Sequence, residues 1–154
     1  MERRIFELAD EAATRRLGQT LAALARPGDV IMLHGTLGMG KSTLARSFIQ
    51  ALTSTDEDVP SPTFTLVQMY EGANGDIWHF DLYRLDKPED SFELGIEDAF
   101  ADGISLIEWP DRLGRLAPRR RLDIHLHLGQ HDTARRAELI SHEQWNDRLG
   151  DIHL

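Results

Sequence analysis

Residues 35–43 have the residue types and spacing of a phosphate-binding loop. They read Gly-Thr-Leu-Gly-Met-Gly-Lys-Ser-Thr, which fits the pattern G-x-x-x-x-G-K-[ST]. Glycines let the backbone curl so that successive N–H groups point at one anion. In such a loop Lys41 reaches the β- and γ-phosphates, and the Ser42 hydroxyl ligates Mg²⁺. The residues predicted to contact a nucleoside triphosphate here are Gly38, Met39, Gly40, Lys41, Ser42 and Thr43.

The segments on either side of this loop support the assignment. Residues 30–33, Val-Ile-Met-Leu, are an apolar run typical of a buried strand. After the loop, Leu44, Phe48 and Leu52 fall on one face of a helix. The alternative is a glycine-rich turn that precedes a helix by chance. A strand, a glycine-rich turn and a helix in this order are the context that a phosphate loop requires, so we favour nucleotide binding.

Two carboxylates follow apolar strands and could complete a hydrolytic site, which needs a metal ligand and a group that positions water. Glu108 ends the apolar run 104–107, and Asp81 ends another strand-like run. Mg²⁺ prefers oxygen ligands and keeps several waters, so the Ser42 hydroxyl and one carboxylate can be enough. The alternatives are a solvated acid at a strand end for Glu108 and a salt bridge to Arg84 for Asp81.

Residues 61–65, Ser-Pro-Thr-Phe-Thr, lie where many phosphate-loop proteins place a switch segment. A threonine hydroxyl there could sense the γ-phosphate or the metal ion. An ordinary turn is the alternative. For His79 we expect a hydrogen-bonded structural role rather than that of a base, and for Trp109 a packing role.

The rest of the chain predicts alternating helices and strands. Asp10 or Thr14 could cap a first helix, and Asn74-Gly75 marks a hairpin turn. The other expected elements are strands at 63–70, 76–83, 104–107, 121–128 and 134–140, helical pieces within 88–102, and a helix at 142–149. We therefore predict an α/β fold, a P-loop NTPase-like three-layer sandwich with a mixed parallel and antiparallel sheet. The strands at 30–33 and 104–107 are expected to be parallel neighbours.

Length and composition limit the possible classes of protein. The 154 residues suggest one domain, 1–154. The chain has no cysteine, which excludes disulfides, thiol catalysis and cysteine-based zinc sites. No apolar run approaches the roughly 20 residues that span a bilayer, and the N-terminus lacks the apolar core of a signal peptide, so a cytoplasmic location is expected. The formal net charge of −9 argues against autonomous binding of nucleic acid.

Several motifs in a fixed order resemble one family. The phosphate loop is followed by Ser-Pro-Thr-Phe-Thr-Leu-Val at 61–67 and by His-x-Asp-Leu-Tyr-Arg-Leu at 79–85. Glu-Leu-Gly at 93–95 and Ile-Glu-Trp-Pro at 107–110 come next. This combination resembles TsaE, the bacterial ATPase of tRNA threonylcarbamoyladenosine biosynthesis, across essentially the whole chain.

The resemblance implies an ATPase that acts with two partners, TsaD and TsaB, of which TsaD transfers a threonylcarbamoyl group to adenosine 37 of tRNA. It implies ATP and Mg²⁺ as cofactors, with tRNA held only by the partner complex. Residues 38–43 would bind the phosphates, and Ser42 and Glu108 would ligate Mg²⁺. Asp81 would be the other acid needed for hydrolysis, and Glu11 would approach the nucleotide base. The bulky Met39 departs from the small residue common in the family.

Two other functions remain open at this point. A small-molecule kinase usually carries an arginine-rich lid, and Arg119-Arg120-Arg121 could imitate one, but it leads directly into a strand. A nucleotide-dependent binding module with negligible hydrolysis alone is the non-enzyme alternative, in which a partner completes the site. A GTPase is disfavoured because no N-K-x-D sequence occurs.

Overall fold

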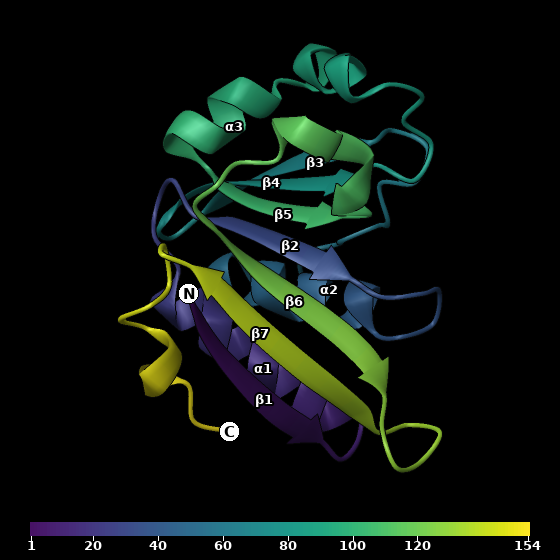
Figure 1. The fold of residues 1–154 in the computed structure, drawn as a ribbon, viewed down its shortest axis with the longest axis vertical. Coiled ribbons are helices and arrows are strands. Elements are labelled where there is room, and N and C mark those ends of the chain that lie inside the picture. The colour runs from purple at the N-terminus through teal and green to yellow at the C-terminus, as the bar shows by residue number, and fades with distance from the viewer.

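A seven-stranded mixed sheet forms the middle layer of the protein (Figure 1), for which a computed structural model describes all residues 1–154. The strand order is β1-β7-β6-β2-β5-β4-β3. The strands are β1 (Glu2–Leu8), β2 (Val30–His34), β3 (Val67–Gly72), β4 (Gly75–Asp81), β5 (Ile104–Glu108), β6 (Arg121–Leu128) and β7 (Arg135–His142). The α-helices are α1 (Glu11–Leu24), α2 (Lys41–Leu52) and α3 (Ile96–Asp102), and the 3₁₀ helices are η1 (Pro88–Leu94), η2 (Pro110–Leu116) and η3 (Leu149–Asp151).

The four central strands are parallel, and antiparallel strands flank them on both sides. β2 pairs in parallel with β5 on one side and with β6 on the other, and β4 is parallel to β5. β3 joins β4 as an antiparallel hairpin, while β7 and β1 continue the sheet antiparallel to β6. The predicted mixed sheet and the parallel pairing of the two apolar strands are confirmed.

The two faces of the sheet carry separate hydrophobic layers. Successive side chains of a strand point to opposite faces, so Ile31 and Leu33 of β2 pack with α1 and α2. Val30 and Met32 pack on the other face, in a smaller cluster that includes residues of α3 and η2. In Figure 1 the helices α1 and α2 lie behind the sheet. The result is the predicted three-layer α/β arrangement.

The helix boundaries follow local signals. The Asp10 carboxylate accepts a hydrogen bond from the Ala13 backbone N–H at 2.9 Å and so caps α1, one of the two predicted caps. Gly95, with a φ of +81°, separates η1 from α3, and Gly103 ends α3, as predicted. The strand predicted at 63–70 begins later, at Val67.

The chain ends differ from the prediction. β1 was not predicted, because it pairs only with β7, more than 120 residues away in the sequence. The helix predicted at 142–149 is wrong, since only the short η3 forms there. Glu143 has a φ of +69°, a left-handed conformation that cannot continue a right-handed helix. The apolar side chains of this segment, Trp145, Leu149 and Ile152, are nevertheless buried.

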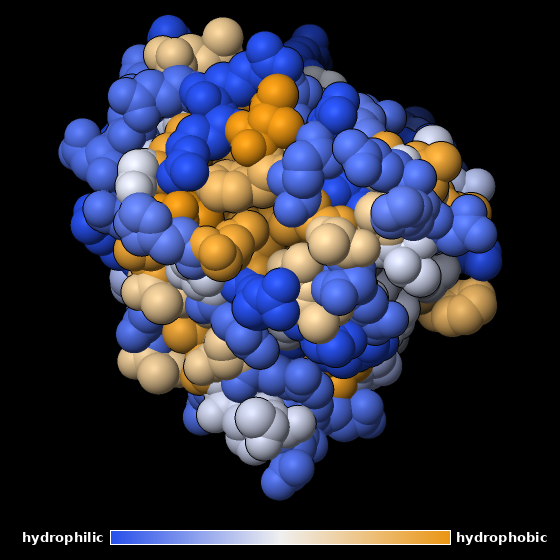
Figure 2. Space-filling model, turned by 90° about the horizontal axis from the view of Figure 1, so that it is seen from below, coloured by the Kyte–Doolittle hydropathy of each residue, from blue (hydrophilic) through white to orange (hydrophobic).

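The surface is largely hydrophilic. Seen from below, hydrophobic residues gather in a hollow surrounded by hydrophilic ones (Figure 2). Leu37, at the tip of the phosphate loop, and Phe64 are 77% and 82% exposed, which places two large apolar side chains near the candidate site. None of the helices has the length and apolar character needed to span a bilayer.

A buried ion pair fastens the C-terminal segment to the turn before β2. The Arg148 guanidinium donates two hydrogen bonds to the Asp29 carboxylate, at 2.6 and 2.9 Å, and both side chains are buried. Arg148 also donates to the backbone carbonyls of Leu24 and Gln144 and stacks on the Trp145 ring. The segment is therefore ordered by polar contacts to the core rather than by helix formation.

Removing one partner of this pair should destabilise the protein strongly. The Arg148→Met substitution leaves the Asp29 carboxylate buried without its cation, which costs about 3–5 kcal/mol. The free energy of unfolding in urea should fall by that amount. Arg115→Ala is the control, because the Arg115–Glu89 pair is exposed and is worth at most about 1 kcal/mol. Equal losses in the two variants would contradict this account.

Candidate nucleotide-binding site

A cavity of about 380 Å³ lies at the carboxyl ends of β2, β4 and β5. In open α/β sheets, ligands bind outside the carboxyl ends of parallel strands. The pairing register places Asp81 of β4 opposite Glu108 of β5, and Glu108 opposite Leu33 of β2, which leads into the phosphate loop. The cavity is lined by Glu11, Thr14, Leu37, Gly38, Gly40, Lys41, Ser42, Thr43, Ser61, Thr63, Asp81, Glu108, Trp109, Asp132, Thr133 and Arg135.

The loop backbone can bind an anion. Gly38 and Gly40 have φ values of +83° and +101°, a left-handed region that strains residues with a Cβ atom. Gly40 immediately precedes α2, and no side chain caps this helix end. The first N–H groups of a helix have no partner within the helix, and they carry its positive dipole end. A phosphate is the type of ligand that suits such a helix end.

Lys41 is held between the loop and a tryptophan. Its Nζ donates a hydrogen bond to the Gly35 carbonyl at 2.6 Å and lies 3.6 Å from the centre of the Trp109 ring. Burial lowers the pKa of Lys41 from its ordinary value, while the nearby carboxylates of Glu108, Asp81 and Asp111 oppose that shift. The carboxylates and the Trp109 ring favour the charged form of Lys41. A charged ammonium at this position is suited to a negatively charged ligand such as a phosphate.

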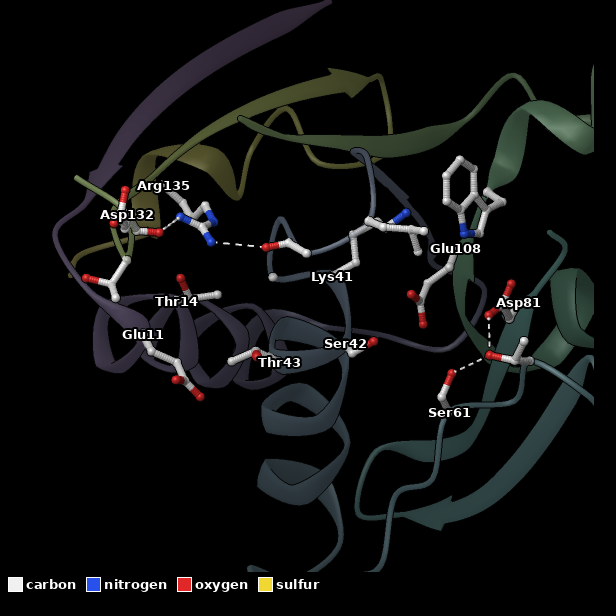
Figure 3. Close-up of a pocket in the computed structure, with 16 residues that line it drawn as sticks. Glu11, Thr14, Lys41, Ser42, Thr43, Ser61, Asp81, Glu108, Asp132 and Arg135 are labelled. Carbon is white, nitrogen blue, oxygen red and sulfur yellow. Dashed lines mark hydrogen bonds between the residues drawn. The ribbon is translucent and has the colours of Figure 1, made fainter. Parts of the chain in front are cut away.

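The two predicted acids lie side by side and point into the cavity (Figure 3). Glu108 is 3% exposed, and its Oε2 is 2.7 Å from Nε2 of the equally buried His79. This contact gives His79 the structural role that was predicted. Asp81 accepts hydrogen bonds from the Thr63 hydroxyl at 3.2 Å and from the Tyr83 backbone N–H at 3.0 Å. No salt bridge joins Asp81 to Arg84, so the predicted alternative for Asp81 is wrong.

The 61–65 segment contacts one of the two acids, Asp81, directly. The hydroxyls of Ser61 and Thr63 lie 2.8 Å apart, and both residues line the cavity. The chain of contacts from Ser61 through Thr63 to Asp81 links this segment to the end of β4 (Figure 3). A ligand that touches either hydroxyl would therefore also affect the orientation of the Asp81 carboxylate.

The oxygen donors of the cavity fit Mg²⁺. Ser42 offers a hydroxyl at the start of α2, and the carboxylates of Glu108 and Asp81 face it across the cavity (Figure 3). Mg²⁺ takes oxygen ligands and is usually held by one or two carboxylates together with substrate phosphates. The contact with His79 fixes the orientation of the Glu108 carboxylate through one of its oxygens. Metal ligands are commonly oriented by such a hydrogen-bonded neighbour.

Arg135, at the start of β7, holds the phosphate loop from outside. Its Nη2 donates to the Gly38 carbonyl at 3.0 Å and its Nε to the Met39 carbonyl at 3.2 Å. Its Nη1 donates to two carbonyls in the β6–β7 turn, those of Asp132 and Ala134. Arg135 therefore ties the loop to that turn. No local sequence signal marks Arg135, because its partners in the phosphate loop are backbone atoms nearly a hundred residues away.

The structure brings most of the predicted residues together. Every predicted phosphate-loop residue except Met39 lines the cavity, as do Glu11, Asp81 and Glu108. Met39 lines a neighbouring cavity of about 600 Å³ instead, so its bulk does not narrow the first one. The cavity residues that the sequence analysis missed are Thr14, Leu37, Asp132, Thr133 and Arg135, together with Trp109, for which only a packing role was expected.

Comparison with known proteins identifies the family. A sequence model of the threonylcarbamoyl adenosine biosynthesis protein TsaE matches residues 8–137. The chain is 38% identical to the tRNA threonylcarbamoyladenosine biosynthesis protein TsaE of Haemophilus influenzae over 140 residues, 87% of each chain. It is 37% identical to that of Bacillus subtilis over 112 residues, 72% of this chain and 69% of the other.

A solved structure agrees with this assignment. The crystal structure of Bacillus subtilis YdiB superposes with a TM-score of 0.79 at 26% identity, over 97% of this chain and 93% of that one. The similarity therefore includes the flanking strands and the C-terminal segment as well as the loop and its helix. Sequence and fold lead to the same conclusion, that the chain belongs to the TsaE family of tRNA threonylcarbamoyladenosine biosynthesis.

Proposed function

We propose that this protein binds ATP with Mg²⁺, hydrolyses it, and thereby supports the threonylcarbamoylation of tRNA adenosine 37 by TsaD and TsaB. The observation that supports this most is the cavity itself. An uncapped helix end and its glycine-rich loop face two buried carboxylates across a space lined by hydroxyl groups. Phosphoryl transfer requires these parts, which are an anion cradle, metal ligands and a group that orients water.

Binding of ATP would use the loop first. The N–H groups of Gly38 and Gly40 and those at the start of α2 would cradle the phosphates, and Lys41 would exchange the Gly35 carbonyl for phosphate oxygens. Ser42 and Glu108 would hold Mg²⁺, which neutralises charge on the β- and γ-phosphates. Glu11, at the start of α1 and at one end of the cavity, lies where the base or ribose would extend (Figure 3).

Hydrolysis would use the acids on the other wall. Asp81 would orient a water molecule, whose oxygen forms a bond to the γ-phosphorus as the bond from phosphorus to the ADP oxygen breaks. The water proton passes to a carboxylate or a phosphate oxygen, and ADP and phosphate leave. Thr63, bonded to Asp81, would report the presence of the γ-phosphate to the 61–65 segment.

The kinase alternative gains no support from the structure. The residues that could imitate an arginine-rich lid are Arg119, Arg120 and Arg121, and none of them lines the cavity. Arg121 begins β6 and is engaged by Asp123 and by the Pro118 carbonyl. The binding-module alternative differs from our proposal only in how much hydrolysis occurs without the partners.

The partner assignment rests on the family and on charge. The chain belongs to the TsaE family, and its formal net charge is −9. A net negative charge opposes binding to the phosphates of nucleic acid, which basic side chains neutralise. We therefore assign tRNA binding to the TsaD–TsaB complex in the cytoplasm, with this protein acting on that complex.

Lys41→Ala should weaken ATP binding about 10- to 100-fold, because a hydrogen bond to a charged group contributes about 1.5–3 kcal/mol. Isothermal titration calorimetry with a non-hydrolysable ATP analogue measures the dissociation constant. The matched control is Lys87→Ala, since Lys87 is the only other lysine and is exposed. An unchanged affinity in Lys41→Ala would rule out the phosphate role of Lys41.

Glu108→Gln should retain most of the affinity for the nucleotide but lose hydrolysis by at least about 100-fold, because it removes a proposed Mg²⁺ ligand and a bound metal ion stabilises the transition state by several kcal/mol. Phosphate release is measured with Mg²⁺ and purified TsaD and TsaB, and then with each partner alone. Glu97→Gln, which removes an exposed carboxylate of α3, is the control. Wild-type turnover in Glu108→Gln would contradict the assignment, and absence of stimulation by the partners would contradict their role.

Arg135→Ala should weaken ATP binding by up to about 30-fold, because the phosphate loop loses the two hydrogen bonds that Arg135 donates to its carbonyls. The lost hydrogen bonds contribute about 1 kcal/mol each. The control is the neighbouring Arg136→Ala, which removes an exposed arginine paired with Glu7. Arg135→Lys should recover only part of the affinity, since a single ammonium lacks the rigid fork whose Nε and Nη2 reach the loop while Nη1 bonds the β6–β7 turn. Equal affinities of the two alanine variants would show that the support is dispensable.

A further inference from the structure

A second cluster of metal-ligating side chains lies on the sheet face opposite α1 and α2. Register places His34, the last residue of β2, beside His125 of β6, and Asp123 is two residues earlier on the same face of β6. The Nε2 of His34 lies 2.9 Å from Oδ1 of Asp123, and the rings of His34 and His125 are stacked with centres 4.2 Å apart. The ligand atoms of these three residues all lie within 4.8 Å of one another.

We propose that His34, Asp123 and His125 form a site for a divalent transition-metal ion of the zinc, cobalt and nickel class. Two imidazoles and one carboxylate are a donor set that these metals bind well. Metal–nitrogen and metal–oxygen bonds of about 2.0–2.2 Å place two ligand atoms of one tetrahedral ion about 3.3–3.6 Å apart. His34 Nε2 and Asp123 Oδ1 are hydrogen-bonded at 2.9 Å, so an ion that replaced the hydrogen would need them to separate by only about 0.5 Å.

The surroundings of Asp123 orient it as a ligand. His142 of β7 lies 2.9 Å from Oδ2, the other carboxylate oxygen, and Nε of Arg121 contacts both oxygens at 3.1–3.2 Å. Oδ1 has two lone pairs and already faces His34 and Arg121, so an ion would bind Oδ1 by taking the place of the hydrogen between it and His34 Nε2. Histidine and arginine partners of this kind fix the direction of a metal ligand.

An ion can reach the cluster from solvent. His34 and His125 line the cavity of about 600 Å³ that lies beside the phosphate loop, and the His34 side chain is 26% exposed. None of the three proposed ligands lines the nucleotide cavity. The site is therefore separate from the proposed Mg²⁺ ligands Ser42 and Glu108, and its nitrogen donors favour transition metals over Mg²⁺.

Cobalt is the probe for this site, because its visible absorption reports nitrogen ligation and coordination number. Protein without a histidine tag is first dialysed against a chelator and is then titrated with Co²⁺ in the absence of nucleotide. We expect one Co²⁺ per chain, visible absorption that saturates with the calorimetric isotherm, and a melting temperature that rises with Co²⁺ concentration. A large excess of Mg²⁺ should not displace the ion.

Variants test which residues hold the ion. His125→Asn should weaken Co²⁺ binding at least about tenfold. Loss of a residue that only hydrogen-bonds to a metal ligand already lowers metal affinity about 10- to 100-fold. His127→Asn is the matched control, because His127 lines the same cavity two residues along β6 but lies outside the cluster. Asp123→Asn is the second ligand variant, with circular dichroism confirming that each variant is folded.

Four results would overturn the proposal. The first is the absence of saturable Co²⁺ absorption in the wild-type protein. The second is Co²⁺ binding by His125→Asn that equals the wild type, and the third is an equal loss in His125→Asn and His127→Asn. Loss in Glu108→Gln would also overturn it, because that result would place the ion at the nucleotide site.

Discussion

The parallel pairing of β2, β5 and β4 is the constraint on which the candidate site depends. Parallel strands end at the same edge of a sheet, so this pairing brings the phosphate loop, Glu108 and Asp81 to one place although they are far apart in the sequence. A shift of one residue in the β4–β5 register would turn Asp81 to the opposite face. The buried apolar residues on both faces of β2 and β5 resist such a shift.

The acids remain in a buried setting because polar neighbours compensate for lost water. Glu108 has His79, and Asp81 has Thr63 and the Tyr83 backbone N–H. A buried charge without such partners would cost several kcal/mol. Charges act more strongly at such a site, because the interior screens them less than water does. The same burial that makes these groups costly therefore makes them effective toward a phosphate.

The sequence was sufficient where function depends on local backbone chemistry. Gly38, Gly40 and Lys41 belong to one short motif, and Glu108 directly follows an apolar run typical of a strand. These two local patterns were enough to predict that the residues line one cavity. It was insufficient where contacts depend on register between distant strands. Arg135 bonds to the loop carbonyls, and β1 pairs with β7, only because the sheet brings them together. At the C-terminus, the expected helix does not form, because Trp145 and Leu149 are buried in a segment that is held by the long-range pair of Arg148 with Asp29.

Lys41 and Trp109 link the two cavities, because both residues line each of them. The Lys41 ammonium donates to the Gly35 carbonyl over the Trp109 ring, and it has to give up that acceptor to reach a phosphate. Trp109 has a φ of +57°, a strained value for a bulky residue, held between Glu108 and Pro110. Movement of Lys41 would therefore uncover one face of a strained tryptophan at the end of β5. Lys41, Trp109 and Gly35 also form part of the wall of the second cavity, next to His34. A new position of Lys41 would therefore change the shape of that wall as well.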